Sequence, residues 1–340
     1  MSRPAGLVIV VAALTAVSFA APAQGETAEE FFKGKQINLI IGYNPGGTYD
    51  IYARLAANLL PKYIPGNPKI IPQNMPGVGS AKAGDYLFNQ ASRDGLTLGM
   101  IGQQLVVSQA LGDATIKFDI SKFHWLGRFT TGGELTAVWH TSPTKTLADA
   151  MKRETTVAVT SAGSSSDSLL QLMNRLAGTQ FKIVRGYRGV AGTVLAMERG
   201  ETEAGHATVE QLLFNHSDWL RDKKVNVLVQ YAMTRHPAFA EVPAMGELGK
   251  TPLDKQVIGL FAGAEEIGRT IVLPPGVPPD RLAVLRKAFD DMIKDPAFRQ
   301  ELEQRNLEFD PMSSTKVEQR VAAMLGVSSE VVQAAIAASR

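Results

Sequence analysis

The sequence contains no cysteine among its 340 residues, which excludes disulfide bonds, thiolate zinc sites and a lipid-modified cysteine. It also lacks long runs of like charge, and 35 basic residues against 33 acidic ones leave a formal charge of +2. A nucleic-acid partner is therefore not expected. The hydrophobic content of 45% is ordinary for a chain that buries a core, and the length suits two lobes or domains.

Motifs for nucleotides and metals are missing as well. The phosphate-loop pattern GxxxxGK[ST] is absent, and Gly77-Val78-Gly79 lacks the third glycine of a dinucleotide fingerprint. The histidines show no HExxH spacing, so each is expected to lie at the surface or in the core: His124, His140, His206, His216 and His236. We expect no cofactor and no metal.

The N-terminal segment has the order of an export signal. Arg3 precedes an uncharged stretch with an apolar centre over residues 6–21, and Ala21-Pro22-Ala23 supplies a small-residue cleavage site. A retained membrane anchor is the alternative, but the apolar centre is shorter than the roughly 20 residues of a spanning helix. We expect residues 1–25 to be a cleaved signal peptide and the mature chain to be soluble in a bacterial periplasm.

Strands alternate with helices along the chain. Residues 36–42 (QINLIIG) read as a strand and residues 50–63 as an amphipathic helix, with turn formers between them. The same order recurs over residues 156–176 and 181–199. This alternation predicts an α/β fold with largely parallel sheets. A further strand over residues 225–231 leads into a proline-rich, loop-like stretch that we interpret as a crossing back to the first lobe.

The loop from Tyr43 to Asp50 is a candidate anion site. The first N–H groups of a helix have no internal partners, and the helix dipole adds partial positive charge there. Gly46 and Gly47 allow a ligand oxygen to approach the backbone closely, Thr48 adds a hydroxyl, and Tyr49 adds an aromatic face. The alternative is a tight turn that merely caps the helix through Thr48 or Asp50, and a capping role explains Asp50 more simply than a general base.

A second hydroxyl-rich loop, Ser161 to Ser166, opens another helix in the other half of the chain. Ligands of open α/β sheets lie beyond the carboxyl ends of the strands, where both loops are expected. Two such helix ends would hold a solute from both sides, although the serines could equally serve as caps. A serine hydrolase is a lesser alternative, since the loop misses the last glycine of GxSxG and Ser142-Pro143-Thr144-Lys145 has neither SDN nor KTG downstream.

Several motifs, in order along the chain, resemble those of the tripartite tricarboxylate transporter receptors, the TctC or Bug family of periplasmic solute-binding proteins. They are Gly46 to Asp50 (PGGxxD), Asn74 to Gly79 (NRPGAGG), Arg93 to Leu98 (PDGYTL), Ser161 to Ser166 (SAGxGT), Tyr187 to Gly189 (YKG), Val242 to Met245 (VPTL) and Pro274 to Leu282 (APAGTPxxxxxRL). Three positions depart from the family pattern: Gly42-Tyr43-Asn44 replaces a PFP-type approach, Tyr49 replaces a common threonine, and Ala207 stands near a frequent acid.

The resemblance implies a type II periplasmic-binding-protein fold, a Venus flytrap whose two α/β lobes are joined by two crossovers. The expected lobes are residues 26–126 plus 233–340 and residues 127–232, hinged near residues 125–129 and 224–231. The residues expected to bind the solute are Tyr43, Gly46, Gly47, Thr48, Tyr49, Asp50, Gln103, Ser161, Gly163, Ser164, Ser165, Ser166, Tyr187 and Thr208.

The resemblance also implies a function. We expect a monomeric, non-enzymatic receptor that captures a small mono-, di- or tricarboxylate and delivers it to integral membrane transporter subunits. An aromatic carboxylate is possible given Tyr43 and Tyr49. The alternatives are a sensory receptor that presents its ligand to a signalling partner, and a periplasmic hydrolase that uses Ser164 or Ser165.

Overall fold

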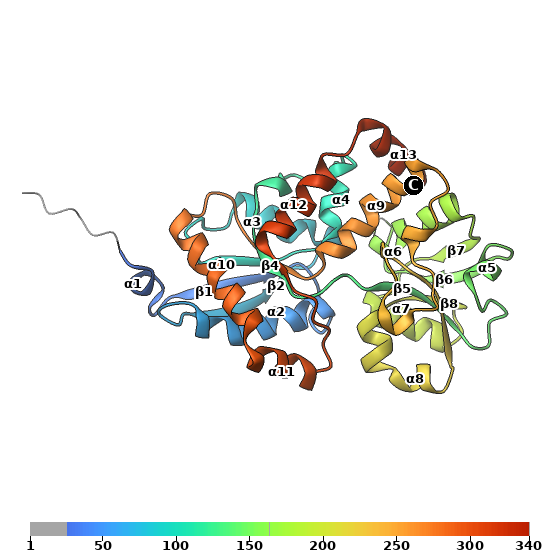
Figure 1. Ribbon diagram of the computed structural model, residues 1–340, viewed down its shortest axis with the longest axis horizontal. Helices are drawn as coiled ribbons and strands as arrows, with labels where there is room; N and C mark the ends of the chain where they lie inside the picture. The colour runs from blue at the N-terminus through green and yellow to red at the C-terminus, as the bar shows by residue number, and fades with distance from the viewer. Residues whose placement is uncertain (1–25, 163, 340) are drawn as a thin grey trace, which may run out of the picture.

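The strands of the chain form two separate sheets, each flanked by helices (Figure 1). The computed structural model describes residues 26–162 and 164–339; the expected signal peptide over residues 1–25 lies outside them. The first sheet has the strand order β11-β4-β10-β3-β1-β2 and the second has the order β7-β6-β8-β5-β9. The chain therefore folds into two α/β lobes, as predicted.

The strands of the first sheet are β1 (Gln36–Ile41), β2 (Lys69–Asn74), β3 (Thr97–Met100), β4 (His124–Arg128), β10 (Thr270–Leu273) and β11 (Met312–Ser313). Those of the second sheet are β5 (Glu134–Trp139), β6 (Thr155–Ala158), β7 (Phe181–Val184), β8 (Ala204–Thr208) and β9 (Val225–Gln230).

The α-helices before the return to the first sheet are α1 (Ala28–Phe32), α2 (Thr48–Leu59), α3 (Ala81–Asn89), α4 (Gln104–Ala110), α5 (Leu147–Ala150), α6 (Ser165–Leu172), α7 (Gly189–Glu198) and α8 (Ser217–Arg221). The later ones are α9 (Pro252–Ile267), α10 (Pro279–Lys294), α11 (Pro296–Gln304), α12 (Ser314–Leu325) and α13 (Ser329–Ser339).

Each sheet is mixed, which corrects the expectation of largely parallel sheets. The β1 strand pairs in parallel with β2 and β3, and β6 pairs in parallel with β7 and β8, because helices connect these strands. The β10 strand runs antiparallel to β3 and β4, and β5 runs antiparallel to β8 and β9. These antiparallel strands lie where the chain enters a sheet from the other lobe.

The chain passes from the first sheet to the second between Arg128, the last residue of β4, and Glu134, the first residue of β5. It returns after β9 through α9, which leads into β10. The proline-rich stretch was expected to be loop-like, but Pro252 occupies the first turn of α9. The Thr251 side chain accepts a hydrogen bond from Asp254 N, so the proline begins a helix there instead of ending one.

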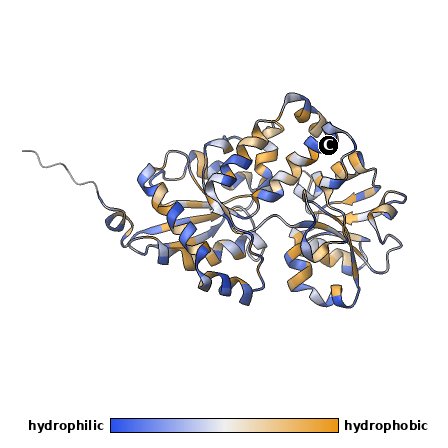
Figure 2. Cartoon of the chain, in the orientation of Figure 1, coloured by the Kyte–Doolittle hydropathy of each residue, from blue (hydrophilic) through white to orange (hydrophobic). Residues whose placement is uncertain are grey.

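The strands of both sheets carry many hydrophobic residues (Figure 2). In β1, Ile37, Leu39 and Ile41 are fully buried, and Tyr52, Ala53 and Ala56 of α2 belong to the same cluster. This packing fixes the start of α2 relative to the end of β1, and so places the loop between them.

The last two helices connect the lobes a further time. Helix α12 contacts β4 and α4, as expected for a helix on the first lobe, whereas α13 contacts α9 and also α6 of the second lobe (Figure 1). Among the described residues, no single helix has the length and apolar character needed to cross a membrane; the sharply bent pair α12 and α13 passes that test by length and composition only.

Candidate functional site

The loop that joins β1 to α2 is held in shape by Asp50. This buried carboxylate accepts hydrogen bonds from Gly46 N at 2.9 Å, Arg54 Nε at 2.9 Å and Asn74 Nδ2 at 2.8 Å. Burial raises the pKa of Asp50, but the hydrogen bonds from Arg54, Gly46 and Asn74 outweigh it, so the pKa lies below its ordinary value. Asp50 thus stays ionised and ties the loop to β2.

The expected cap by Thr48 or Asp50 is not what the helix uses. Gly47 is the N-cap residue of α2, with extended backbone angles and no side-chain capping bond. Thr48 and Asp50 lie inside the first turn, and the Asp50 carboxylate reaches back to Gly46 N, before the N-cap, and does not cap an N–H group of the helix. The first N–H groups of α2 therefore remain available to a ligand oxygen, with Gly46 and Gly47 exposed beside them.

Two tyrosines stand over this loop. The rings of Tyr43 and Tyr49 lie 4.3 Å apart between centroids at an angle of 31°, and the guanidinium of Arg269 lies 5.1 Å from the Tyr49 ring centroid. The Tyr49 hydroxyl accepts a long hydrogen bond of 3.4 Å from Gln103 N. Burial raises the pKa of both phenols, so both remain neutral hydroxyls.

The second loop opens α6. Ser164 is the N-cap residue; its hydroxyl accepts from Asp167 N at 3.3 Å and donates to Ser161 O at 2.7 Å. Its Oγ lies 3.1 Å from Ser166 Oγ, and Ser166 is buried. Ser164 therefore caps α6, which was one of the two roles that the sequence allowed for the serines of this loop. Gly163 lies outside the described residues.

The two loops are stabilised in the same way, by a salt bridge between an aspartate and an arginine. Asp50 stands three residues after the N-cap of α2, and Asp167 stands three residues after the N-cap of α6. Each buried aspartate pairs with an arginine: Arg54 Nε lies 2.9 Å from Asp50, and Arg185 Nε lies 2.7 Å from Asp167. A salt bridge in each lobe thus stabilises the turn that presents the helix N-terminus.

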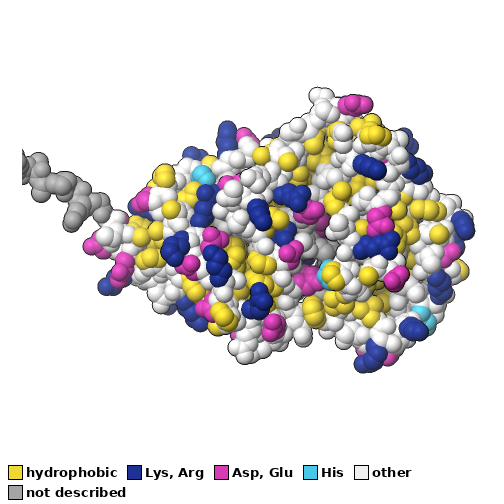
Figure 3. Space-filling model, in the orientation of Figure 1, with side chains coloured by type: hydrophobic (Ala, Val, Ile, Leu, Met, Phe, Trp, Pro, Cys, Tyr) yellow, Lys and Arg dark blue, Asp and Glu magenta, His cyan; other side chains and the backbone are white. Residues whose placement is uncertain are grey.

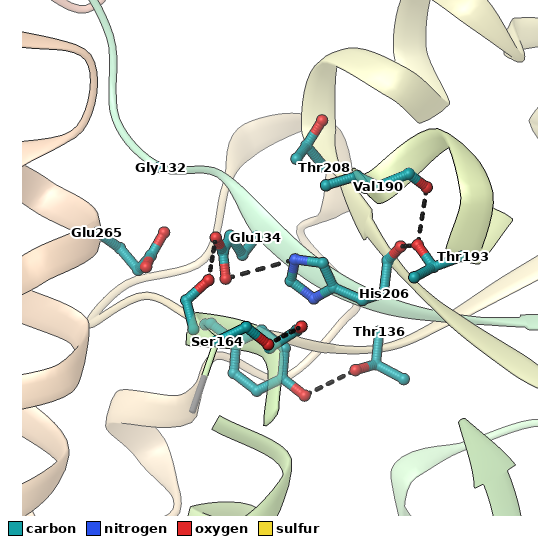
Figure 4. Close-up of polar contacts among 12 residues, drawn as sticks. Gly132, Glu134, Thr136, Ser164, Val190, Thr193, His206, Thr208 and Glu265 are labelled. Carbon is teal, nitrogen blue, oxygen red and sulfur yellow. Dashed lines mark hydrogen bonds and ion pairs between the residues drawn. The ribbon is translucent and has the colours of Figure 1, made fainter. Parts of the chain in front are cut away.

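A cluster of charged side chains lies where the chain crosses between the lobes (Figure 4). Glu134 Oε1 accepts a hydrogen bond from Ser165 Oγ at 2.9 Å, and Glu134 Oε2 lies 3.4 Å from His206 Nε2. Glu265 of α9 points toward Glu134 from the other lobe (Figure 4). The site is therefore acidic at the crossover.

The buried cation of this cluster is Arg269. Its Nη1 donates to Thr131 O at 2.8 Å and to Gly132 O at 2.5 Å, so it binds the crossover backbone. Burial raises the pKa of Glu265, and the charge of Glu134 raises it further. The pKa of Glu210 is also raised by burial, against the lowering effect of Arg269. Burial lowers the pKa of His206, which favours its neutral form.

A cavity of about 570 Å³ opens between the lobes at this crossover, and the space-filling view shows a hollow there (Figure 3). Among the residues that line it are Thr130, Thr131, Gly133, Glu134 and Leu135 of the crossover, the stretch after β9 and Glu265; the α2 loop and the serines of α6 do not line it. Its size suits a small molecule rather than a protein segment.

A sequence profile of the tripartite tricarboxylate transporter family receptors, TctC, matches residues 52–335. The chain belongs to this family. Its members are solute-binding receptors, and the two-lobed mixed α/β architecture above is the one they share.

Solved TctC-type structures agree in fold. One is the R. palustris protein with adipate, with a TM-score of 0.67, 18% identity and coverage of 88% of this chain and 97% of the other. Another is MatC from Rhodopseudomonas palustris with bound malate, with a TM-score of 0.64, 21% identity and coverage of 88% and 99%. A UPF0065 protein of Cupriavidus necator is 26% identical over 313 residues, 89% of this chain and 87% of its own length.

The structure brings many of the expected site residues together at the lobe boundary. Tyr43 and Tyr49 lie in contact, Gln103 joins them through its backbone, and its side chain reaches Glu265 at 3.4 Å. Burial is the main cause that raises the pKa of Tyr43, and the charge of Glu134 raises it further. The Ser165 hydroxyl donates a hydrogen bond to the same Glu134. The two TctC-like loops thus approach one carboxylate from opposite lobes.

Other expected residues are placed differently. The phenol of Tyr187 lies next to Glu201, a residue that follows the end of α7. Burial raises the pKa of Tyr187, and the Glu201 carboxylate raises it further. The hydroxyl of Thr208 accepts from Gln211 N at 3.3 Å and points away from Glu134 in Figure 4. Ser161 is exposed and contributes its carbonyl to the Ser164 cap. These three side chains do not join the cluster around Glu134 within the described residues.

Sequence reasoning missed five residues of the cluster: Glu134, His206, Glu210, Glu265 and Arg269. One signal could have found two of them, because Glu265 and Arg269 interrupt the apolar run from Val257 to Leu273. A charge inside a buried apolar segment needs a functional or pairing partner. Within the described residues, no group of three or more His, Cys, Asp or Glu side chains is placed to hold a metal ion.

Proposed function

We propose that this TctC-family protein is a periplasmic receptor that captures a small carboxylate between its two lobes and does no chemistry on it. The proposed lobes are residues 26–126 plus 233–340 and residues 127–232, although Gly127 and Arg128 of β4 pair within the first sheet. The observation that carries the proposal is the pair of helix N-termini, those of α2 and α6, which reach the lobe boundary from separate sheets. The start of α2 offers uncapped backbone N–H groups and partial positive charge, and the start of α6 meets the Glu134 carboxylate.

The ligand class is supported by the family and by the relatives. Adipate and malate are bound by two proteins of the same fold, and both are dicarboxylates. In this chain the free N–H groups at Gly47 and Thr48 would take one carboxylate. Tyr43, Tyr49 and Gln103 would form the adjoining wall, with Ser164, Ser165 and Ser166 on the opposite lobe.

The polar contacts favour binding over hydrolysis. A catalytic serine needs a histidine in hydrogen-bond reach and an acid behind that histidine. Here Ser165 donates to Glu134, and His206 lies on the far side of the same carboxylate. Ser164 donates to a backbone carbonyl. Neither hydroxyl is paired with a base that could activate it.

Calorimetry and thermal unfolding against a panel of mono-, di- and tricarboxylates test the proposal. A true ligand at 100 times its Kd is expected to stabilise the fold by about 2.7 kcal/mol. Gly47→Val is expected to weaken binding at least tenfold, because the valine side chain would occupy the space where the ligand carboxylate approaches the start of α2. A Cβ atom at this position meets only Asn44 O, at 3.8 Å, so the protein itself should tolerate the change. Gly259→Ala, in an open position of α9, is the matched control.

Full affinity in Gly47→Val would remove the α2 loop from the site, and absence of binding by any member of the panel would contradict the carboxylate assignment. Delivery to a transporter is tested separately. Cross-linking of the ligand-bound protein to membranes of its own cell, followed by mass spectrometry, is expected to identify integral membrane permease subunits; a signalling kinase in their place would support a sensory role.

A further inference from the structure

Three carboxyl groups converge on the glycine pair of the crossover. A Cβ atom on Gly132 would lie 1.7 Å from Glu265 Oε2, and a Cβ atom on Gly133 would lie 3.7 Å from Glu210 Oε2. Glu134 follows directly in the chain. These acids come from α9, from the turn after β8 and from β5, so the fold gathers them from both lobes.

The cluster has an excess of negative charge. Arg269 is its buried cation, and both of the hydrogen bonds described for its guanidinium go to backbone carbonyls. His206, from β8, has its pKa lowered by burial and contributes no positive charge at neutral pH. Three carboxyl groups therefore face one arginine, and burial raises the pKa of Glu265 and of Glu210, so the excess of negative charge is relieved either by protons or by a bound cation.

The polar atoms left without a partner include several acceptors. Gln103 Oε1 and both carboxyl oxygens of Glu210 are buried without a hydrogen-bond donor of ordinary geometry among the described residues, and Glu134 Oε2 has His206 Nε2 beside it at 3.4 Å. Gln103 is 4% exposed, and its amide lies beside Glu265. Such acceptors call for a group that is rich in donors, and an ammonium carries three N–H donors and no acceptor.

The two helix N-termini differ in what they face. At α6 the positive pole already has a carboxylate of this chain in front of it, because Ser165 donates to Glu134. At α2 the exposed Gly46 and Gly47 have no such carboxylate before them, since Asp50 lies behind the loop with Arg54 and Asn74. The anionic end of a ligand therefore fits the α2 side, and the opposite side presents negative charge.

We propose that the cleft selects a zwitterionic ligand: its carboxylate binds at the start of α2, and a protonated amine or comparable nitrogen cation binds between Glu134 and Glu265. The inference rests on the proposed carboxylate-binding function and names the ligand class more closely. Tyr43 and Tyr49, whose faces adjoin both regions, would line the path between the two charged ends.

The test compares ligand pairs that differ only in the amine: succinate with aspartate, glutarate with glutamate, and butyrate with γ-aminobutyrate. Isothermal calorimetry on the wild-type protein is expected to show at least tenfold tighter binding of the amine-bearing member in the best pair. Glu134→Gln and Glu265→Gln should each remove most of this preference. Glu203→Gln, which changes a carboxylate paired with Arg153 beside the other end of β5, should keep it.

Proton exchange gives a second readout. Burial and the charge of Glu134 raise the pKa of Glu265, and a cation bound beside it should lower that pKa, so a proton that Glu265 carries before binding should be released on binding. Calorimetry in two buffers of different ionisation enthalpy is expected to show net proton release for the amine-bearing ligand and none in Glu265→Gln. The groups that act on this carboxyl are Glu134, Glu210, Arg269, Gln103, Tyr43 and Tyr49.

The outcomes separate the two proposals. If an amine-free carboxylate binds as tightly as its amine-bearing partner, or more tightly, the zwitterion inference is overturned while the carboxylate receptor stands. If no member of any pair binds, the zwitterion inference is overturned, and the wider carboxylate panel decides whether the receptor proposal stands. The wild-type comparison needs no variant, so a misfolded mutant cannot decide it.

Discussion

The Ser165 hydroxyl donates a 2.9 Å hydrogen bond to the Glu134 carboxylate and so joins the first turn of α6 to the first residue of β5. The bond places a negative group of the protein where a ligand anion would otherwise meet the helix. Ser165→Ala removes this donor and leaves Glu134 Oε1 unpaired. A loss of about 1 to 3 kcal/mol is expected when a buried acceptor loses its donor. Ser168→Ala, in the same helix, is the control, and chemical denaturation is the measurement.

Gly132 has no room for a side chain. The Cβ of Gly132→Ala would overlap Glu265 Oε2 at 1.7 Å, so the carboxyl has to move. We expect a destabilisation of about 1 to 3 kcal/mol, typical of an overpacked site. Gly259→Ala in α9 meets nothing within 4 Å and should instead stabilise by roughly 0.5 to 1 kcal/mol. Equal unfolding free energies for the two variants would contradict this assignment.

Asp50 should make stability depend on pH in the acid range. Its folded pKa is lowered below 3.8, so its contribution is present above that ordinary value and is lost as pH falls through the folded pKa. We expect Asp50→Asn to be about 1 to 3 kcal/mol less stable than wild type at pH 7. The difference should shrink as the pH is lowered below 3.8. Urea denaturation across this range checks the prediction, and a difference that is constant with pH would count against it.

The ring of Tyr49 should matter more than its hydroxyl. Tyr49→Phe keeps the stack with Tyr43 and the contact with Arg269, and loses the 3.4 Å bond from Gln103 N and the hydroxyl contact with Tyr43. Its unfolding free energy should stay within about 0.5 kcal/mol of wild type, since that bond is long. Tyr49→Ala loses both ring contacts, worth roughly 1 to 3 kcal/mol together. Thermal melts of the two variants distinguish ring from hydroxyl.

Local sequence signals predict the first sheet and its loops well. Residues 36–42 alternate with a glycine stop and become β1, and the four-residue periodicity after Asp50 becomes α2. The α9 helix was missed because prolines were interpreted as breakers, although Thr251 and Asp254 form a capping box around Pro252. The two-lobed architecture followed from family resemblance, and the order of the strands was not predicted, because pairing partners such as β3 and β10 lie far apart in sequence.

The candidate site was predictable where it is built from contiguous loops. Gly46 to Asp50 and Ser161 to Ser166 carry visible turn and hydroxyl patterns, and both lie at helix starts. The acidic cluster had no such pattern, because Glu134 and Glu265 meet only after the chain has crossed between lobes and returned. No local spacing encodes a contact of that kind.

The contacts that helix α13 makes with both lobes matter for any biosensor built from this receptor. It rests on α9 and on α6, the helix whose first turn holds Ser164 and Ser165. If ligand binding rotates the second lobe, α13 has to slide or bend. A fluorescent dye attached to this helix would therefore report lobe closure from a position away from the solute. A protein fused rigidly to the same helix would instead oppose closure of the lobes.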